Sequence, residues 1–287
     1  FQIKTKMKQY LDALRHILEH GADRQSRTGI STRAVFGMQL RFNMEDGFPA
    51  VTTKKLPWKS VASELLWFIE GSSDERRLAE ILHGTRDASK ATIWTANAEA
   101  GYWKPKAKFQ GDLGRIYGVQ WRRWKGHDGR EIDQLANAIN MIKENPTSRR
   151  IIVTAWNPGE LQEMALPPCH AFFQFFAANG KLSLQMYQRS CDMFLGIPFN
   201  IASYSLLLHM VSQVTGLKPG EFIHTLADAH IYHNHFEQVK EQLSRKPFPL
   251  PKLWLNPEIK NIDDFTMDDI KLENYQFHPP IKAEMAV

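Results

Sequence analysis

Two apolar segments joined by a short polar turn constrain the fold of this chain more than any other feature. Residues 171–178 and 182–188 each have the length and apolar character of a strand, and Asn179-Gly180 lies between them. An Asn-Gly pair suits the positive φ angles of a two-residue hairpin turn. The pattern therefore predicts an antiparallel β-hairpin.

Helical and extended patterns alternate along the rest of the chain without a strict βαβ rhythm. Helices are predicted at 7–18, 57–69, 132–142, 200–215 and 236–243, and strands at 35–44, 151–156, 221–226 and, as the last one, 252–255. Residues 217–220 are expected to form a loop. Because no repeat or linker divides the chain, we expect one α+β (mixed α/β) domain over residues 1–287, with a large sheet flanked by helices.

Cys169 stands at the mouth of the first hairpin strand, directly after Pro167 and Pro168. Neighbouring residues on a strand point to opposite faces, so a protease-like pair between Cys169 and His170 is not expected. A nearby guanidinium is the group that would favour the thiolate instead. Cys169 is therefore a candidate nucleophile.

A dense group of polar side chains follows the hairpin: Arg189, Ser190, Asp192 and Asn200 lie within a dozen residues. An arginine and a hydroxyl can hold a phosphate, and a carboxylate can accept hydrogen bonds from a ring. An amide can donate and accept at once, so it can recognise a polar edge. Together with Cys169, these side chains make this stretch the candidate active site.

Composition limits the other possibilities. The chain is 43% hydrophobic and 23% charged, which is ordinary for a soluble globular protein. Its net charge of +5 suits an anionic small molecule, and the basic residues are dispersed among acidic ones rather than gathered for nucleic acid. Two cysteines make no disulfide framework, and no stretch approaches a membrane span, so we expect a cytoplasmic protein.

Three closely spaced histidines, His230, His233 and His235, raise the question of a metal site. Metal sites with histidine usually include a supporting set of Cys, Asp or Glu ligands at characteristic spacings. That set is missing from this segment, so no metal is predicted.

Four motifs in a fixed order carry a resemblance to a known family: PPCH, YQRSCD, LGIPFNIASY and HTLADAHIY. In these motifs the chain resembles thymidylate synthase, and the resemblance runs from Met7 to Val287. It implies an enzyme, a methyltransferase, that converts dUMP to dTMP. The implied one-carbon and hydride donor is 5,10-methylenetetrahydrofolate, and the implied reaction passes through a covalent bond from Cys169 to pyrimidine C6.

The resemblance also implies roles for individual residues. The implied catalytic residues are Cys169, Glu64, Tyr117, Arg189 and Asp192. The implied substrate-binding residues are Arg27, Arg149, Arg150, Arg189, Ser190, Asn200, His230 and Tyr232, and those implied to contact the folate are Trp94, Leu166, Asp192, Gly196 and Ala286.

Several of these residues have ordinary structural interpretations when the family is set aside. Glu64 lies beside an apolar helix stripe and is as readily a surface glutamate. Trp94 is as readily a packed aromatic, and so is Tyr117, whose glycine-flanked context looks strand-like. Arg27 is as readily a solvated loop charge, and the tail 277–287 has the character of a frayed terminus.

The family also implies a homodimer, in which Arg149 and Arg150 reach the phosphate bound by the partner subunit, and a C-terminal lid over the folate. Asn200 fits a uracil edge better than a cytosine edge, because cytosine reverses the donor and acceptor positions.

A dUMP 5-hydroxymethylase, in which water replaces hydride, is the main alternative. Thr95, Arg115 and Ala227 stand where the family usually has aspartate, proline and glycine, and they leave room for it. A cysteine hydrolase, with His230 as the formal partner of Cys169, and a nucleic-acid-binding module are weaker alternatives. Residues 101–110 have no interpretation from the sequence.

Overall fold

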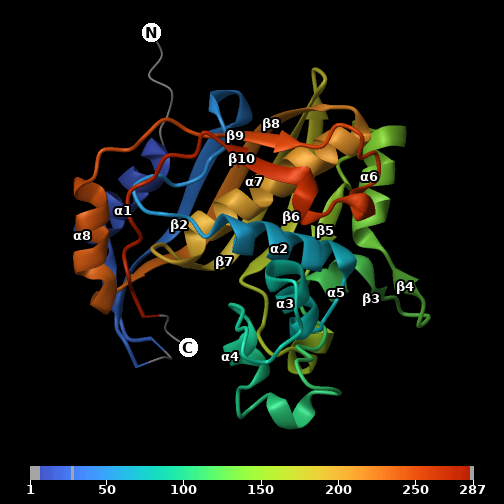
Figure 1. Ribbon diagram of the computed structural model, residues 1–287, viewed down its shortest axis with the longest axis horizontal. Helices are drawn as coiled ribbons and strands as arrows, with labels where there is room; N and C mark the ends of the chain where they lie inside the picture. The colour runs from blue at the N-terminus through green and yellow to red at the C-terminus, as the bar shows by residue number, and fades with distance from the viewer. Residues whose placement is uncertain (1–6, 27–28, 285–287) are drawn as a thin grey trace.

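A six-stranded sheet organises the computed structural model, which describes residues 7–26 and 29–284 (Figure 1). The strands are β1 Ala22–Arg24, β2 Thr32–Asn43, β5 Ile152–Thr154, β6 His170–Ala178, β7 Lys181–Asp192 and β8 Lys218–Tyr232, in the order β1-β2-β8-β7-β6-β5. Neighbouring strands are antiparallel except β7 and β8, which run parallel. The large mixed sheet confirms the expected fold class.

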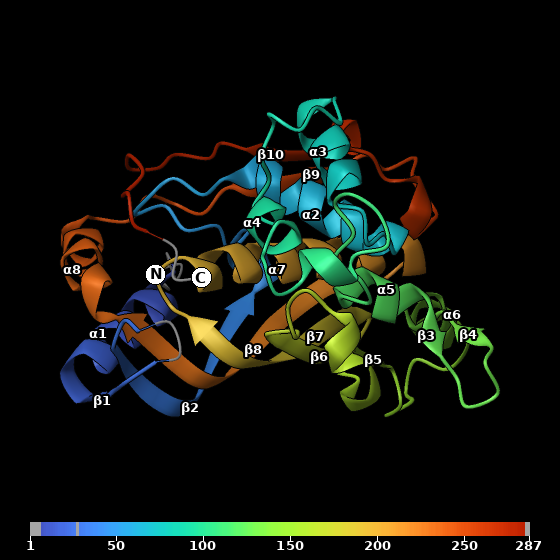
Figure 2. The same cartoon turned by 90° about the horizontal axis from the view of Figure 1, so that it is seen from below.

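Helix α7 Gly196–Thr215 covers one face of the sheet, and α2 Trp58–Glu70 packs beyond it (Figure 2). Helix α7 contacts both β7 and β8 and is buried along most of its length. A helix that is apolar all round is stable only inside a core. The other helices are α1 Lys8–His20, α3 Glu75–His83, α4 Thr95–Ala98, α5 Tyr117–Arg122, α6 Gln134–Glu144 and α8 Phe236–Ser244.

Two small hairpins complete the regular structure. Strand β3 Trp124–Lys125 pairs with β4 Glu131–Ile132, and β9 Lys252–Leu255 pairs with β10 Ile270–Glu273. The expectation that residues 252–255 form the last strand is wrong, because β10 follows and supplies the partner of β9. Within the described ranges 7–26 and 29–284, no helix is both long and apolar enough to cross a bilayer.

The predicted hairpin is present as β6 and β7. Asn179 and Gly180 have φ angles of 53° and 72°, the positive values that a type I′ turn requires. The turn places residues 178 and 181 opposite each other, and the register holds back to the Phe172–Tyr187 pair, beyond which it shifts before His170 pairs with Gln188. This hairpin brings Cys169, just before β6, next to the end of β7.

Two other local predictions were wrong for tertiary reasons. Residues 218–220 are not a loop, because β8 begins at Lys218 and pairs with the start of β7. Tyr117 is not on a strand but begins α5. A Cβ on Gly118 would lie 2.4 Å from the Phe68 carbonyl oxygen, so its glycine allows α5 to approach α2 closely.

The start of α7 also differs from the prediction, since the helix begins at Gly196 rather than at residue 200. Pro198 lies in the first turn, where its missing N–H has no intrahelical partner to lose. The earlier start places Gly196 and Asn200 on the first turns of the helix, next to the end of β7.

The sheet face that points away from α7 carries large apolar side chains in contact with solvent. Phe172 and Phe176 alternate with the buried residues of β6, and Ile152 pairs across from Gln174 on the same side. Their exposed fractions are 41% for Phe172, 66% for Phe176 and 44% for Ile152. Apolar groups gathered on one sheet face indicate a surface that another molecule covers.

Replacing Gly180 by Ala is expected to lower the free energy of unfolding by about 1 kcal/mol, because a side chain at positive φ is strained. A Cβ added at residue 180 would have no heavy atom within 4 Å, so the effect isolates backbone conformation. Gly101→Ala is the matched control, since that position is equally open and has no positive φ. Urea denaturation measures both variants, and equal stabilities would contradict the assignment of the turn.

Candidate active site

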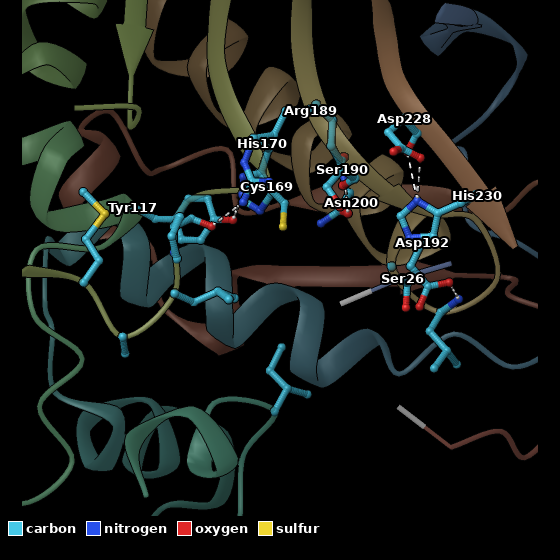
Figure 3. A pocket seen from close by; sticks show the side chains of 18 of the residues that line it. Ser26, Tyr117, Cys169, His170, Arg189, Ser190, Asp192, Asn200, Asp228 and His230 are labelled. Carbon is cyan, nitrogen blue, oxygen red and sulfur yellow. Dashed lines mark hydrogen bonds and ion pairs between the residues drawn. The ribbon is translucent and has the colours of Figure 1, made fainter. Parts of the chain in front are cut away.

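A cavity of about 1250 Å³ lies where β7 ends and α7 begins. Most of the predicted site residues line it: Glu64, Tyr117, Leu166, Cys169, Arg189, Ser190, Asp192, Gly196, Asn200, His230 and Tyr232. Figure 3 shows Cys169, Asn200 and Asp192 around a common space, although they come from three different segments. The fold therefore gathers one site from α2, α5, the loop before β6, β7, α7 and β8.

Cys169 is half-buried and is held by its backbone. Its N–H donates to the Tyr117 Oη at 2.7 Å, and its carbonyl accepts the Arg189 backbone N–H at 2.8 Å. Burial raises the pKa of the Cys169 thiol, and the positive charge of Arg189 opposes that rise. The Arg189 guanidinium favours the thiolate, as expected from the sequence. Burial raises the thiol pKa by more than the guanidinium lowers it, so the thiol remains mostly protonated at neutral pH.

The Arg189 guanidinium holds the loop that carries the thiol. Its Nε donates to the Pro168 carbonyl at 2.8 Å and its Nη2 to the Pro167 carbonyl at 3.0 Å. It also lies 5.3 Å from the centre of the Trp156 ring. These contacts place a fixed positive charge at the cavity wall beside Cys169.

His170 does not act as a base for the thiol in this geometry. Its Nδ1 lies 2.6 Å from the Tyr204 Oη, and its ring stacks on Tyr117 with centroids 4.1 Å apart. Burial lowers the pKa of His170 to about 3, so the ring is neutral. His230, the other formal partner, has its Nδ1 near the Asp228 carboxylate, and among the described residues no hydrogen bond joins its ring to Cys169, so the Cys–His pair of a hydrolase is not formed.

Glu64 is buried rather than at the helix surface, and it is 5% exposed. Trp94 donates its indole Nε1–H to Glu64 Oε1 at 2.7 Å. Burial raises the pKa of Glu64 to about 7, and the hydrogen bond from Trp94 opposes the rise. A carboxyl with this pKa can take up or release a proton near neutral pH, which is the property of a general acid or base.

Tyr117 is buried against the thiol loop, and its phenol oxygen accepts the Cys169 N–H. Burial raises the pKa of Tyr117 well above its usual value, so the phenol keeps its proton. Because the oxygen accepts from the backbone, the phenolic proton can be donated toward the cavity, which Tyr117 lines.

Asp192 has a structural and a potential binding role. Its Oδ1 accepts the backbone N–H groups of Phe194 and Leu195 at 3.0 and 3.1 Å, which orders the entry to α7. The side chain also lines the cavity.

Lys54, which the sequence did not single out, is buried beside Asp192, donates to the Phe194 carbonyl and lies 3.5 Å from the Phe194 ring centre. Burial lowers the pKa of Lys54 to about 7, and the Asp192 charge opposes this.

The far end of the cavity carries a charged cluster that the sequence did not predict as a unit. His230 Nδ1 lies 3.2 Å from Asp228 Oδ1, and Arg24 donates to Asp228 Oδ2 at 2.8 Å. Arg24 and Asp228 both line the cavity. No periodic or motif signal joins Arg24 to residue 228, since the contact depends on the pairing of β1, β2 and β8.

Five predicted residues are not part of the described cavity. One is Trp94, which does not line it but is buried and donates to Glu64, a residue that does. Arg149 and Arg150 are exposed, precede β5 and do not line it. Arg27 and Ala286 lie outside the described residues. Two positions before Ala286 in the chain, the Glu284 carbonyl lies 2.7 Å from His235 Nε2, and Ala283 lines the cavity, so the described part of the tail reaches the site.

Residues 101–110, which had no interpretation, form part of the cavity wall. Tyr102 donates its Oη–H to the Ala165 carbonyl at 2.8 Å, and the buried Trp103 donates its Nε1–H to the Asp112 carbonyl at 2.7 Å. Tyr102, Trp103 and Lys106 line the cavity. The segment therefore contacts residue 165, a few positions before Cys169.

The three positions that depart from the usual family residues do not line this cavity. Thr95 donates to the buried Glu75 Oε1 at 2.6 Å, and Arg115 donates from Nε to Glu160 Oε2 at 2.6 Å. Ala227 is buried in β8. Two of the three departures thus have structural partners away from the thiol.

No group of three or more His, Cys, Asp or Glu side chains is placed to hold a metal ion in the part of the chain that the structure describes. The three neighbouring histidines each contact a different group. His230 faces Asp228, His233 faces Asp23, and His235 faces the Glu284 carbonyl.

A family model described as thymidylate synthase matches residues 8–287. The match spans nearly the whole chain, including the sheet, the cavity and all four motifs. It confirms the resemblance that the motifs indicated.

Replacing Glu64 by Gln is expected to stabilise the protein by about 2 kcal/mol more at pH 8 than at pH 5. Burial raises the pKa of Glu64 from 4.5 to about 7, so the folded state keeps a proton that the unfolded chain releases. The stability due to this proton is present below pH 4.5 and is lost as the pH rises toward 7. Gln does not titrate and keeps an oxygen for Trp94.

Urea denaturation of parent and variant at the two pH values measures this difference. Glu144→Gln is the matched control, because it makes the same change at an exposed helix position. An equal effect of the Glu64 substitution at both pH values would contradict the raised pKa.

Proposed function

Because the chain belongs to the thymidylate synthase family, a family of enzymes that methylate dUMP or run a related reaction with 5,10-methylenetetrahydrofolate, we propose that it converts dUMP to dTMP. The folate supplies the one-carbon unit and the hydride and leaves as dihydrofolate. The observation that carries the proposal is Cys169, a nucleophile fixed beside Arg189 in a cavity whose wall also holds Asn200 and Glu64.

Cys169 forms the covalent bond to the substrate in this proposal. Its sulfur adds to C6 of the uracil ring, and the electron pair of the C5–C6 bond moves toward O4 as an enolate. C5 becomes nucleophilic as a result and can take the one-carbon unit. Arg189 lowers the cost of forming the thiolate in a buried site, which is the step that burial opposes.

Binding of dUMP draws on both ends of the cavity. Arg189 and Ser190 are assigned a cation and a hydroxyl for the phosphate, and His230 and Tyr232, which line the same cavity, are assigned to the sugar hydroxyl. Asn200 recognises the O4 and N3 edge of uracil. Leu166, Gly196 and Asp192 remain for the folate, with the Asp192 carboxylate as acceptor for its pterin ring.

Proton transfer is assigned to Glu64 and Tyr117. The pKa of Glu64, raised by burial to about 7, allows it to exchange a proton with O4 and with the leaving folate nitrogen at neutral pH. Tyr117, which keeps its proton, can assist removal of the C5 proton through a hydrogen-bonded water. The Trp94 hydrogen bond orients the Glu64 carboxyl for this task.

The same geometry supports hydride transfer over addition of water. Trp94 is 5% exposed and donates to Glu64, a residue of the cavity wall, so the indole packs behind that wall beside the Glu64 carboxyl. A dry site favours hydride transfer, because water is the competing nucleophile. Thr95, Arg115 and Ala227 do not line the cavity, so they give the hydroxymethylase alternative less support than their positions in the sequence did.

A homodimer completes the proposal. The exposed Ile152, Phe172 and Phe176 form an apolar sheet face suited to a second copy of the chain. Arg149 and Arg150 immediately precede β5 at the edge of that sheet, outside the cavity of their own chain, and are assigned to the partner's phosphate. A reduced Cys169 is required for turnover, which fits a cytoplasmic location.

Incubation of the protein with dUMP and 5,10-methylenetetrahydrofolate is expected to yield dTMP and dihydrofolate, because the site excludes water after methylene transfer. Mass spectrometry of the nucleotide product and absorbance of dihydrofolate measure the two outcomes. Hydroxymethyl-dUMP with tetrahydrofolate would establish the hydroxymethylase instead.

Cys169→Ser is expected to abolish turnover while keeping dUMP binding. Turnover in that variant would refute the proposed covalent bond between Cys169 and the substrate.

Mixing two inactive variants is expected to restore activity if the sites are shared between subunits. One variant carries Arg149→Ala with Arg150→Ala, and the other carries Cys169→Ser. After exchange of subunits, hybrid dimers hold one intact site, so about a quarter of the parent activity is expected. Cys169→Ser mixed with itself is the control, and no recovery in a verified hybrid would refute the shared phosphate site.

A further inference from the structure

Three side chains form a hydrogen-bonded line from the core to the cavity wall. His224 on β8 lies with its Nε2 2.9 Å from the Gln188 Oε1 on β7. Gln188 donates from Nε2 to the Asn200 Oδ1 on α7 at 3.1 Å, and from the same nitrogen to the Ser190 carbonyl at 3.0 Å. His224 is 0% exposed and Gln188 is 2% exposed, so water does not compete for these groups.

The Ser190 carbonyl sets the direction of the whole line. A backbone carbonyl can only accept, so the end of Gln188 that faces it must be the amide NH2. The second N–H of that group then points to Asn200, and the Asn200 atom that receives it must be the oxygen. The Asn200 NH2 group is thereby left for the cavity, which Asn200 lines.

The same logic assigns the proton on His224. With its NH2 group engaged, Gln188 presents Oε1 to the imidazole, so His224 Nε2 must donate. Burial lowers the pKa of His224 to about 3, so the ring is neutral and has one N–H. Among the described residues, His224 Nδ1 is buried without a hydrogen-bond partner, which agrees with the proton being on Nε2.

We propose that His224 is a positioning residue for substrate specificity: its Nε2–H locks the Gln188 amide, which in turn fixes Asn200 with its NH2 group toward the pyrimidine. This inference rests on the proposed function, because it assumes that Asn200 meets the substrate base. A fixed NH2 group donates to a carbonyl at pyrimidine C4, and it opposes the amino group of cytosine. The remaining lone pair of Asn200 Oδ1 accepts the N3–H of uracil, which cytosine lacks.

The His224 imidazole helps to hold the Gln188 side chain in place, in addition to the hydrogen bond that Gln188 makes to the Ser190 carbonyl. Without a donor at position 224, Gln188 Oε1 becomes a buried acceptor with no partner. The free-energy cost of that acceptor favours another conformation of the Gln188 side chain. Asn200 then loses the neighbour that holds its oxygen. Consecutive donors also polarise one another, so the N–H of His224 strengthens the bonds that follow it.

His224→Phe is the first test, because it keeps an aromatic ring but removes the donor. The affinities for dUMP and for dCMP are measured by isothermal titration calorimetry without folate, so that the readout does not depend on turnover. The variant is expected to lower the ratio of dUMP to dCMP affinity about tenfold, the order expected for one mispaired buried group. An unchanged ratio in a folded variant would overturn the proposal.

His209→Phe is the matched control. His209 on α7 is a half-buried histidine whose Nε2 is enclosed without a hydrogen-bond partner among the described residues, and burial lowers its pKa to about 4. It lies outside the line to Asn200, so it is expected to lose stability without changing the affinity ratio. A similar fall in both variants would show a general packing effect and would refute a specific role for His224.

A second pair of variants covers the case in which His224→Phe does not fold. His224→Gln can place an amide N–H where Nε2 stood and is expected to keep the affinity ratio, whereas His224→Asn reaches only the Nδ1 position and is expected to lower it. Equal ratios in these two variants would refute the proposal. Failure of the parent protein to bind dUMP would instead refute the proposed function, so the two failures are distinguishable.

Discussion

Arg189 ties the loop that carries Cys169 to strand β7, and the rest of the site depends on that attachment. A loop that contains two prolines has few N–H groups of its own, and its carbonyls need donors from elsewhere. Arg189 supplies three, from its backbone and its guanidinium, to the carbonyls of residues 167 to 169. The same guanidinium leaves its charge beside the thiol, so one side chain both positions the nucleophile and opposes the cost of burying it.

Burial has opposite effects on the groups around that thiol, because it always disfavours the charged form. It lowers the pKa of His170 to about 3, which keeps that ring a neutral packing partner of Tyr117. It raises the pKa of Glu64 to about 7, which makes the carboxyl able to exchange protons at neutral pH. One physical effect thus keeps the histidine neutral and gives the glutamate a pKa near neutral pH.

The two faces of the sheet have different tasks. One face is covered by α7, and the cavity forms where that helix begins next to the end of β7. The other face leaves Phe172 and Phe176 exposed. On the covered face, hydrogen bonds join His224 through Gln188 to Asn200 at the cavity, and the proposed role of His224 in specificity rests on this line.

The sequence by itself determined the elements whose signals are local. The Asn179-Gly180 turn follows from the φ angles that these residues tolerate, and the amphipathic and apolar periodicities predicted most helices and strands. The four motifs identified the family and hence the candidate nucleophile. Only the tertiary structure decided that residues 218–220 join β8, since pairing with β7 overrides the local Pro-Gly signal, and that Tyr117 begins a helix. It alone joined Trp94 to Glu64, Arg24 to Asp228 and His224 to Asn200. These contacts link residues far apart in the chain, and their geometry arises from strand register and helix packing, which no local pattern encodes.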